Sequence, residues 1–284
     1  MNSEDEPRAN TGQITSGDEV RRLANLITLE GAWEANAWKH TCLLCWNTGE
    51  SPLYHMDDNG TCCLIQTRTR RFLATCAHVW NAYEAFSGTR VGAQLWLSLT
   101  AGDLCSAPSI PFPLSNPGLI AKDAGLDLAT VTFDGIDSLE AWRFHYLRPA
   151  TTPTVRSGDF IYILGFPGDA VRSGNPWLRL SYCLTARPVH DLGRTQFILH
   201  DEPGNVHHTD RHGRTTPAIR ACGESGAPVF KVARDFGLEL AGIVSRLCSS
   251  GLASGEATPY EMSDGDVFIT HACFIQEDGS LASP

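Results

Sequence analysis

Short hydrophobic runs separated by turn residues dominate the chain after Gly31. The runs are rich in β-branched, aromatic and leucine residues, and Gly, Pro, Asn and Asp interrupt them, a pattern that predicts β-strands. No long amphipathic helix separates the runs, so alternating β-α units are not expected. The predicted strands are 39–46, 61–66, 71–76, 93–98, 128–133, 159–164, 178–184, 196–200, 227–232, 239–245 and 267–270.

The same pattern divides the chain into an arm, two β-rich halves and a linker. Residues 1–30 are mostly polar and acidic, but apolar residues at helical spacing predict a short helix near residues 18–29. Residues 148–158 contain Thr, Pro and Gly and have little to bury, which is typical of a linker. We therefore expect one β-rich domain over residues 31–147 and a second over residues 159–284.

Charge and hydropathy exclude two classes of partner. The formal net charge is −10, whereas nucleic-acid binders usually carry a basic stripe; the basic run at Arg68, Arg70 and Arg71 is interpreted as a hairpin turn. No apolar run reaches the 18 or more residues that span a bilayer. The first residues lack the basic and apolar regions of a secretory leader. We therefore expect a cytoplasmic protein that binds neither nucleic acid nor membrane.

Ten cysteines allow more than one interpretation. An even number suits disulfides in a secreted protein, but without a leader the expected state is free thiols packed as small hydrophobic residues. Cys42, Cys45, Cys62 and Cys63 could instead form a zinc cluster, although Cys42 and Cys45 point to opposite faces if their run is extended. The sequence leaves open whether this cluster is reduced, bridged or metal-bound.

Three segments carry residues suited to nucleophilic catalysis. Ser225 lies between Gly223 and Gly226, and small neighbours allow the tight turn that exposes a nucleophilic hydroxyl. His78 ends a hydrophobic strand, which would hold its ring rigidly. Asp127 opens another hydrophobic strand, where an acid needs a hydrogen-bond partner. Asp123, four residues earlier, is the alternative acid.

The order and spacing of these residues strengthen each single signal. The order His, Asp, Ser is that of chymotrypsin and not of subtilisin or the α/β-hydrolases. Asp127 follows His78 by 49 residues and Ser225 follows Asp127 by 98, close to the roughly 45 and roughly 93 of the chymotrypsin triad. The three residues therefore predict a serine-hydrolase triad.

Across roughly residues 35–275 the chain resembles the trypsin-like (chymotrypsin-fold) serine proteases, and specifically a bacterial-type intracellular relative. The segments that carry the resemblance are Thr75–Val79, Asp127–Ala129, Gly223–Pro228 and Leu240–Ser245, and Gly165–Asp169 resembles a turn common in bacterial members. The resemblance implies two antiparallel six-stranded β-barrels with the active site in the cleft between them.

The resemblance also implies roles for individual residues. His78 is the expected general base, Asp127 the carboxylate that orients it, and Ser225 the nucleophile. Backbone N–H groups of Gly223 and Ser225 are expected to form the oxyanion hole. The substrate would be bound near Ile219, in the position that sets side-chain preference, and along a cleft strand that contains Val244, Ser245 and Arg246.

Several departures from the family bear on regulation and specificity. Val79 stands where the digestive enzymes carry a bridged cysteine, and Cys222 lies one step from the usual half-cystine, which supports a reduced relative. Ile219 replaces the aspartate that gives trypsin its basic preference. An apolar or small preferred side chain is the hypothesis, although Arg220 and Arg246 could recognise an acidic group. The natural substrate, the activation trigger and the oligomeric state do not follow from the sequence.

The expected activity is hydrolysis of peptide bonds through an acyl-enzyme, with no cofactor and no metal. Its substrate would be a protein or peptide, and we expect restraint by a regulatory partner protein, by residues 1–30 or by narrow specificity. Two alternatives are a catalytically silent trypsin-fold scaffold that binds peptides, and a serine esterase. A polar loop holds four residues that could bind a metal, His207, His208, Asp210 and His212. The favoured interpretation is that they form a solvated surface.

Overall fold

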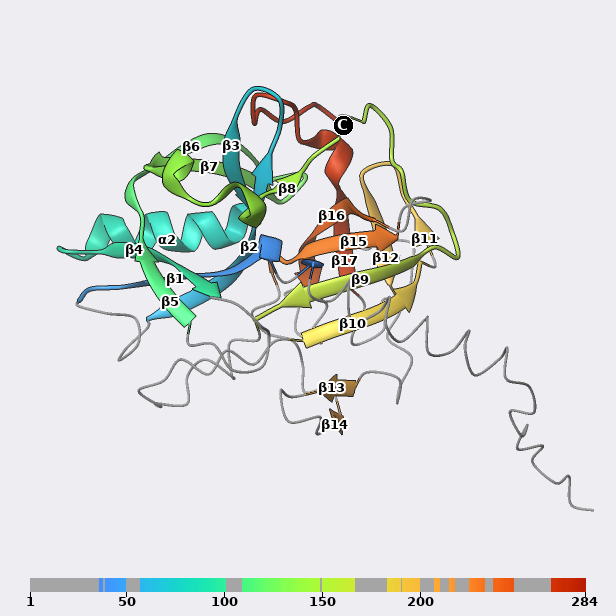
Figure 1. Ribbon diagram of the computed structural model, residues 1–284, viewed down its shortest axis with the longest axis horizontal. Helices are drawn as coiled ribbons and strands as arrows, with labels where there is room; N and C mark the ends of the chain where they lie inside the picture. The colour runs from blue at the N-terminus through green and yellow to red at the C-terminus, as the bar shows by residue number, and fades with distance from the viewer. Residues whose placement is uncertain are drawn as a thin grey trace, which may run out of the picture.

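Each half of the chain forms its own antiparallel sheet, and the two sheets lie side by side (Figure 1). Figure 1 shows a computed structural model. The residues that it describes are 36–37, 39–49, 57–100, 109–148, 150–166, 183–189, 191–199, 207–209, 215–217, 225–232, 237–247 and 267–284.

The first sheet closes into a barrel because one strand pairs at both ends of the strand order. The order is β5-β4-β1-β2-β3-β7-β6, with the short β8 parallel to β2. Only Leu114 separates β5, which pairs with β4, from β6, which pairs with β7, so this single bent run joins the two edges. The strands are β1 (Thr41–Asn47), β2 (Asp58–Gln66), β3 (Arg71–Thr75), β4 (Gln94–Thr100), β5 (Ser109–Pro113), β6 (Ser115–Asp123), β7 (Leu128–Asp134) and β8 (His145–Tyr146).

The second sheet closes in the same way. Its order is β10-β9-β15-β16-β17-β12-β11, and two residues separate β10 from β11 at the opposite ends of that order. With each bent run counted as one strand, and the two-residue β8 set aside, both barrels have six strands, which confirms the predicted fold class. The strands are β9 (Phe160–Gly165), β10 (Cys183–Pro188), β11 (Asp191–Leu192), β12 (Gln196–Leu199), β15 (Pro228–Val232), β16 (Leu238–Leu247) and β17 (Val267–His271). A separate hairpin pairs β13 (His207–Thr209) with β14 (Thr215–Pro217).

One α-helix among the described elements packs against the first barrel. Helix α2 (Ala77–Thr89) buries Val79, Trp80 and Tyr83, which lie on one face at helical spacing. The hydrophobic pattern of the sequence did not predict this helix. Short 3₁₀ helices are η1 (Ile136–Ser138), η2 (Ala141–Arg143) and η3 (Ala272–Phe274). In the described part of the chain, no helix has the length and apolar character to cross a membrane.

Most predicted strands overlap an observed strand, but the closing strand of the first barrel was missed. Residues 109–123 contain three prolines, which argue against a strand because proline cannot donate to the ladder. Each half of this run has a strand neighbour on one side only, and such edges tolerate proline. The predicted strand at 178–184 is observed as Cys183–Pro188, and residues 178–182 and the predicted helix near 18–29 lie outside the described residues.

The two barrels contact each other at Thr61 of β2. Thr61 of β2 donates its backbone N–H to the Ser225 carbonyl at 3.0 Å, and its Oγ1 accepts the Phe166 N–H at 3.1 Å. Both partners lie in the half that carries the second barrel. The first sheet ends at Tyr146 and the second begins at Phe160, so the domain limits proposed from the sequence, with a linker at 148–158, stay a prediction that agrees with this order of strands.

Candidate active site

His78 is the second residue of α2, directly after β3 and the buried Cys76. Strand β3 pairs with both β2 and β7, so the start of the helix is fixed to the barrel wall. The first N–H groups of a helix have no partner inside the helix, and Cys76 at the N-cap supplies no side-chain bond to them. Another residue must therefore satisfy them, and for His78 that residue is Asp127.

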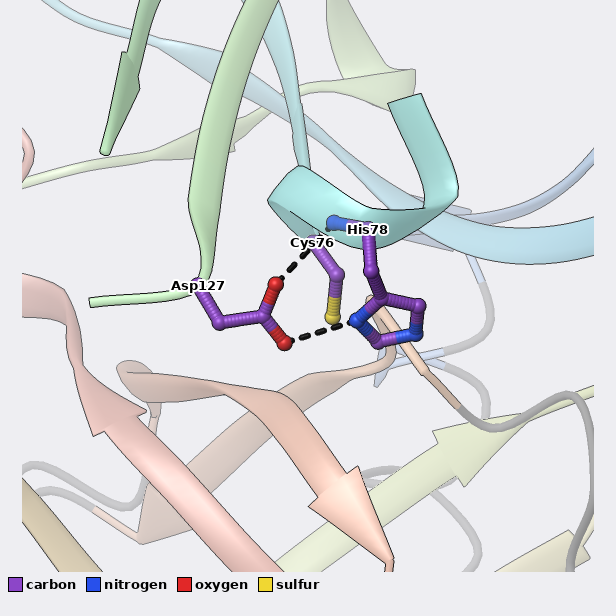
Figure 2. A group of neighbouring side chains, drawn as sticks. All are labelled: Cys76, His78 and Asp127. Atoms are coloured by element: carbon purple, nitrogen blue, oxygen red, sulfur yellow. Dashed lines mark hydrogen bonds and ion pairs between the residues drawn. The ribbon is translucent and has the colours of Figure 1, made fainter. Parts of the chain in front are cut away.

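Asp127 holds His78 through both carboxylate oxygens (Figure 2). Its Oδ1 accepts the His78 backbone N–H at 3.0 Å, and its Oδ2 lies 2.7 Å from His78 Nδ1. The negative carboxylate is also favoured at a helix N-terminus, where the helix dipole is positive. The His78 side chain is half-exposed while that of Asp127 is 16% exposed, so one ring edge is anchored and the other faces outward.

A tight turn presents Asp127 to the histidine. Asp123 Oδ1 accepts the backbone N–H groups of Gly125 and Leu126, at 2.8 and 2.9 Å, and Asp127 itself has a φ of 49°, in the left-handed region. Thr270 of β17 donates to the Leu126 carbonyl at 2.6 Å, which ties the turn to the second barrel. Of the two acids considered from the sequence, Asp127 contacts His78 and Asp123 shapes the turn.

Gly226 places its neighbour Ser225 next to the end of β3. The Gly226 N–H donates to the Val244 carbonyl at 2.9 Å, and Gly226 has a φ of 86°. A Cβ atom there would collide with the Thr61 carbonyl and with Thr75 Oγ1, so only glycine fits. Thr75 precedes His78 by three residues. The packing of Gly226 therefore brings Ser225, which is partly exposed, to the helix end that carries His78.

Cys76 lies beside His78 and Asp127, and the sequence analysis did not single it out. Its Sγ donates to the Val244 carbonyl at 2.7 Å, the carbonyl that also accepts the Gly226 N–H. Burial, and then the nearby Asp127 charge, raise the pKa of its thiol well above the usual value. The only available signal was its position two residues before His78.

The predicted substrate-binding residues have different surroundings. The side chains of Val244 and Ser245 are buried, and the Val244 N–H and carbonyl are both hydrogen-bonded within the protein, to Ala227 and Gly226. Val244 therefore has no free backbone group with which to pair a substrate. Ser245 Oγ donates to the Phe268 carbonyl at 3.0 Å and accepts from Gln196 at 3.1 Å.

Among the described residues, one edge of β16 has no strand neighbour beyond Ile243. Strand β15 pairs with β16 only as far as Ile243, while β17 continues to pair through Leu247 on the other side. Arg246 thus lies on β16 next to an edge that has no strand neighbour in the described residues; its side chain is not described. Gly223 and Ile219, predicted for the oxyanion hole and for side-chain preference, lie outside the described residues, as do His212 and Asp210 of the polar loop.

A comparison with known protein families finds a match over the segments that carry His78, Asp127 and Ser225. The model of the trypsin-like peptidase domain matches residues 60–236, a stretch that contains His78, Asp127 and Ser225. The chain belongs to the trypsin-like peptidase domain family. Among solved structures, this chain is similar to the crystal structure of Deg5. The two chains share 16% identity with a TM-score of 0.44, and the match covers 82% of this chain and 88% of that chain. A search of curated proteins finds no match.

The four clustered cysteines of this trypsin-like peptidase domain are buried thiols. Cys42 lies opposite Cys62 across β1 and β2, and all four, with Cys45 and Cys63, are free. Burial raises the pKa of Cys42 and of Cys45 to about 12, which keeps them protonated. Within the described ranges, the one group of metal-ligating side chains close enough to share an ion is Cys76, His78 and Asp127, and the four cysteines considered for zinc from the sequence are not part of it.

Proposed function

We propose that this chain is a serine endopeptidase that cleaves protein substrates through a His78–Asp127–Ser225 triad. The observation that carries the proposal is the pair of hydrogen bonds that the Asp127 carboxylate accepts from His78. With Nδ1 held by the carboxylate, Nε2 is the ring atom left to accept a proton. In Figure 2 this atom lies on the side of the ring away from Asp127.

The proposed reaction follows from that assignment. Nε2 of His78 takes the Ser225 hydroxyl proton as Oγ attacks a peptide carbonyl, and the tetrahedral oxyanion is stabilised by the N–H groups of Gly223 and Ser225. The protonated imidazole then gives its proton to the leaving amine. Water resolves the acyl-enzyme with His78 again acting as base. The reaction as written requires no cofactor.

The open edge of β16 supports an extended substrate. A peptide added beside Ser245 and Arg246 would continue the sheet through main-chain hydrogen bonds. We propose that Ile219 contributes to the pocket for the preferred side chain and that this pocket takes a small or apolar group. Buried free thiols are compatible with a reducing compartment, and cytoplasmic residence with narrow, processing-type specificity is part of the proposal. Restraint by a partner protein or by residues 1–30 remains a further part of it.

Reaction with a fluorophosphonate probe tests the triad directly. We expect the purified chain to be labelled, the Ser225→Ala variant to be unlabelled, and a Ser87→Ala variant, which changes an exposed serine on α2, to be labelled like the parent. If the parent is unlabelled, both as the full chain and after removal of residues 1–30, the triad is inactive and the silent-scaffold alternative holds.

Substrates then separate a peptidase from an esterase. Peptide and ester substrates with matched leaving groups should both be cleaved by a peptidase, and the Ser225→Ala variant should cleave neither. Cleavage of the ester alone would contradict the endopeptidase proposal. Free degradation of unfolded casein would contradict narrow specificity and leave the triad assignment intact.

A further inference from the structure

Cys76 lies next to the His78–Asp127 pair, and together the three side chains offer three kinds of atom that can bind a metal ion (Figure 2). Its Sγ, a ring nitrogen of His78 and a carboxylate oxygen of Asp127 all lie within 4.8 Å of one another. The peptidase reaction proposed above uses the imidazole and the carboxylate and gives the thiol no part. The proposed reaction therefore does not explain why a fully buried thiol lies at this position.

The three donors match those of a zinc site. Thiolate sulfur, imidazole nitrogen and carboxylate oxygen are the ligand atoms that zinc takes in proteins, at about 2.0–2.3 Å. Around a tetrahedral ion with such bonds the ligand atoms lie about 3.5 Å apart, so small side-chain shifts bring the group from its present spacing to coordination. Water would fill the fourth position from the exposed side of the His78 ring.

Charge and rigidity also suit a divalent ion. A Cys76 thiolate and the Asp127 carboxylate together neutralise two positive charges, so the occupied site would carry no net charge in a largely buried place. The ligands are also held in position before binding. Cys76 lies at the N-cap of α2, and Asp127 is fixed by the turn that Asp123 and Thr270 stabilise.

We propose that Cys76, His78 and Asp127 form an inhibitory site for Zn²⁺ or a similar divalent cation. On binding, the Cys76 thiol loses its proton to solvent and its Sγ bonds to the metal in place of its hydrogen bond to Val244. Nδ1 of His78 gives up the proton that it shares with Asp127 and becomes a metal ligand, while Nε2 takes up a proton from solvent, so the ring stays neutral and carries its single proton on Nε2. Because Nε2 then donates and cannot accept, His78 no longer takes the Ser225 proton. Inhibition rests on the proposed function, whereas metal binding does not.

Metal binding is tested with Co²⁺, which replaces zinc and reports thiolate ligation by an absorption band in the near ultraviolet. The parent protein, kept reduced, should bind Co²⁺ with this band, and the Cys76→Ser and Cys76→Ala variants should bind one equivalent less. The Cys273→Ser variant removes another free, partly exposed thiol and should bind like the parent. Equal Co²⁺ binding by the parent and both Cys76 variants overturns the site.

Inhibition is tested by the rate of fluorophosphonate labelling with and without Zn²⁺. We expect Zn²⁺ to slow labelling of the parent and of Cys273→Ser by about tenfold or more, since a serine protease depends on a correctly protonated histidine. Labelling of the two Cys76 variants should change less than about twofold. Equal slowing of the parent and the Cys76 variants overturns the proposal. A parent that never reacts with the probe refutes the proposed function, and the Co²⁺ titration then still decides the metal site.

Discussion

Among single residues, Asp127 combines two tasks that are often divided between side chains. It caps the first turn of α2 through the His78 N–H and holds the His78 ring through Nδ1. The spacing of His78, Asp127 and Ser225 predicted that these residues belong together. The sequence favoured Asp127, which directly opens the hydrophobic strand, and kept Asp123 as the alternative acid because it precedes the same strand. The distinction depends on a left-handed turn at Asp127, which the sequence does not reveal.

The substitution Asp127→Asn should sharply slow the reaction of Ser225. An asparagine side chain has a single acceptor oxygen, so with that oxygen on the His78 N–H its NH₂ group faces Nδ1 and stabilises the tautomer that has its proton on Nε2, which cannot accept the Ser225 proton. The loss of such a carboxylate costs about 10⁴-fold in kcat in the serine-protease template, and we expect at least about 10²-fold in fluorophosphonate labelling rate. The matched Asp123→Asn variant keeps an oxygen for the turn and should label within about tenfold of the parent. Similar rates for both variants would contradict the role of Asp127.

Gly226→Ala should destabilise the protein more than Gly158→Ala. Both glycines have positive φ, 86° and 83°, so each substitution carries the same conformational cost. Only at Gly226 does an added Cβ collide with other atoms, whereas at Gly158 nothing lies within 4 Å. Urea unfolding should show a loss of about 1 kcal/mol for Gly158→Ala and at least about 1–3 kcal/mol more for Gly226→Ala. An equal loss would mean that the contact with Thr61 and Thr75 relaxes at no cost.

Among the elements, strands with clear hydrophobic runs were predictable and those that depend on partners were not. The runs that became β1, β2, β3 and β7 are buried along most of their length, so burial alone produced a readable pattern. The run through β5 and β6 closes the barrel despite its prolines, and its β6 part is mostly exposed or half-buried. Helix α2 has a weak apolar face because Ala, Asn, Ser and Gly interrupt it, which explains why the hydrophobic pattern did not predict it.

The contact between β8 and β16 should make stability sensitive to acid. Nε2 of His145 accepts the Leu240 N–H at 3.2 Å, and the His145 ring packs against His40 at 5.1 Å. Burial lowers the pKa of His145 to about 3 and of His40 to about 4. Repulsion from His40 and Arg148 also lowers the pKa of His145, and the Lys39 charge lowers that of His40. Both rings are therefore neutral in the folded protein, whereas in the unfolded chain they gain protons below about pH 6.5.

Because the unfolded chain binds these protons first, the free energy of unfolding should fall as pH drops from about 6.5 towards 4. Each histidine contributes a slope of up to about 1.4 kcal/mol per pH unit. Urea unfolding at a series of pH values measures this slope. The His145→Gln variant keeps an acceptor for the Leu240 N–H and removes one titrating group, so its slope between pH 6.5 and 5 should be about half that of the parent. An unchanged slope would show that these histidines do not control the acid response.

Across the whole molecule, residues 272–284 join the second barrel to the first. The segment leaves β17 and lies against the first barrel, where it is the red trace near β3 in Figure 1. Thr67 and Thr69 both donate to the Glu277 carbonyl, at 2.6 and 2.7 Å, and Thr130 donates to that of Gly279. None of these contacts is visible in the sequence, since each joins residues well over a hundred positions apart.

Ending the chain after Gln276 should therefore weaken the union of the barrels. The truncation removes three hydrogen bonds from threonine hydroxyls, and it leaves the buried Thr130 without its acceptor. At about 1 kcal/mol for each bond, we expect a loss of roughly 3 kcal/mol, which for a chain of this size lowers Tm by about 6–12 °C. Removal of residues 283–284 alone spares all three bonds and should leave Tm within about 1 °C of the parent. Calorimetry distinguishes the outcomes. Equal Tm values for the two truncations would show that the segment lies on the barrel surface without stabilising it. A separate low-temperature transition in the variant that ends after Gln276 would show that the segment couples the unfolding of the two barrels.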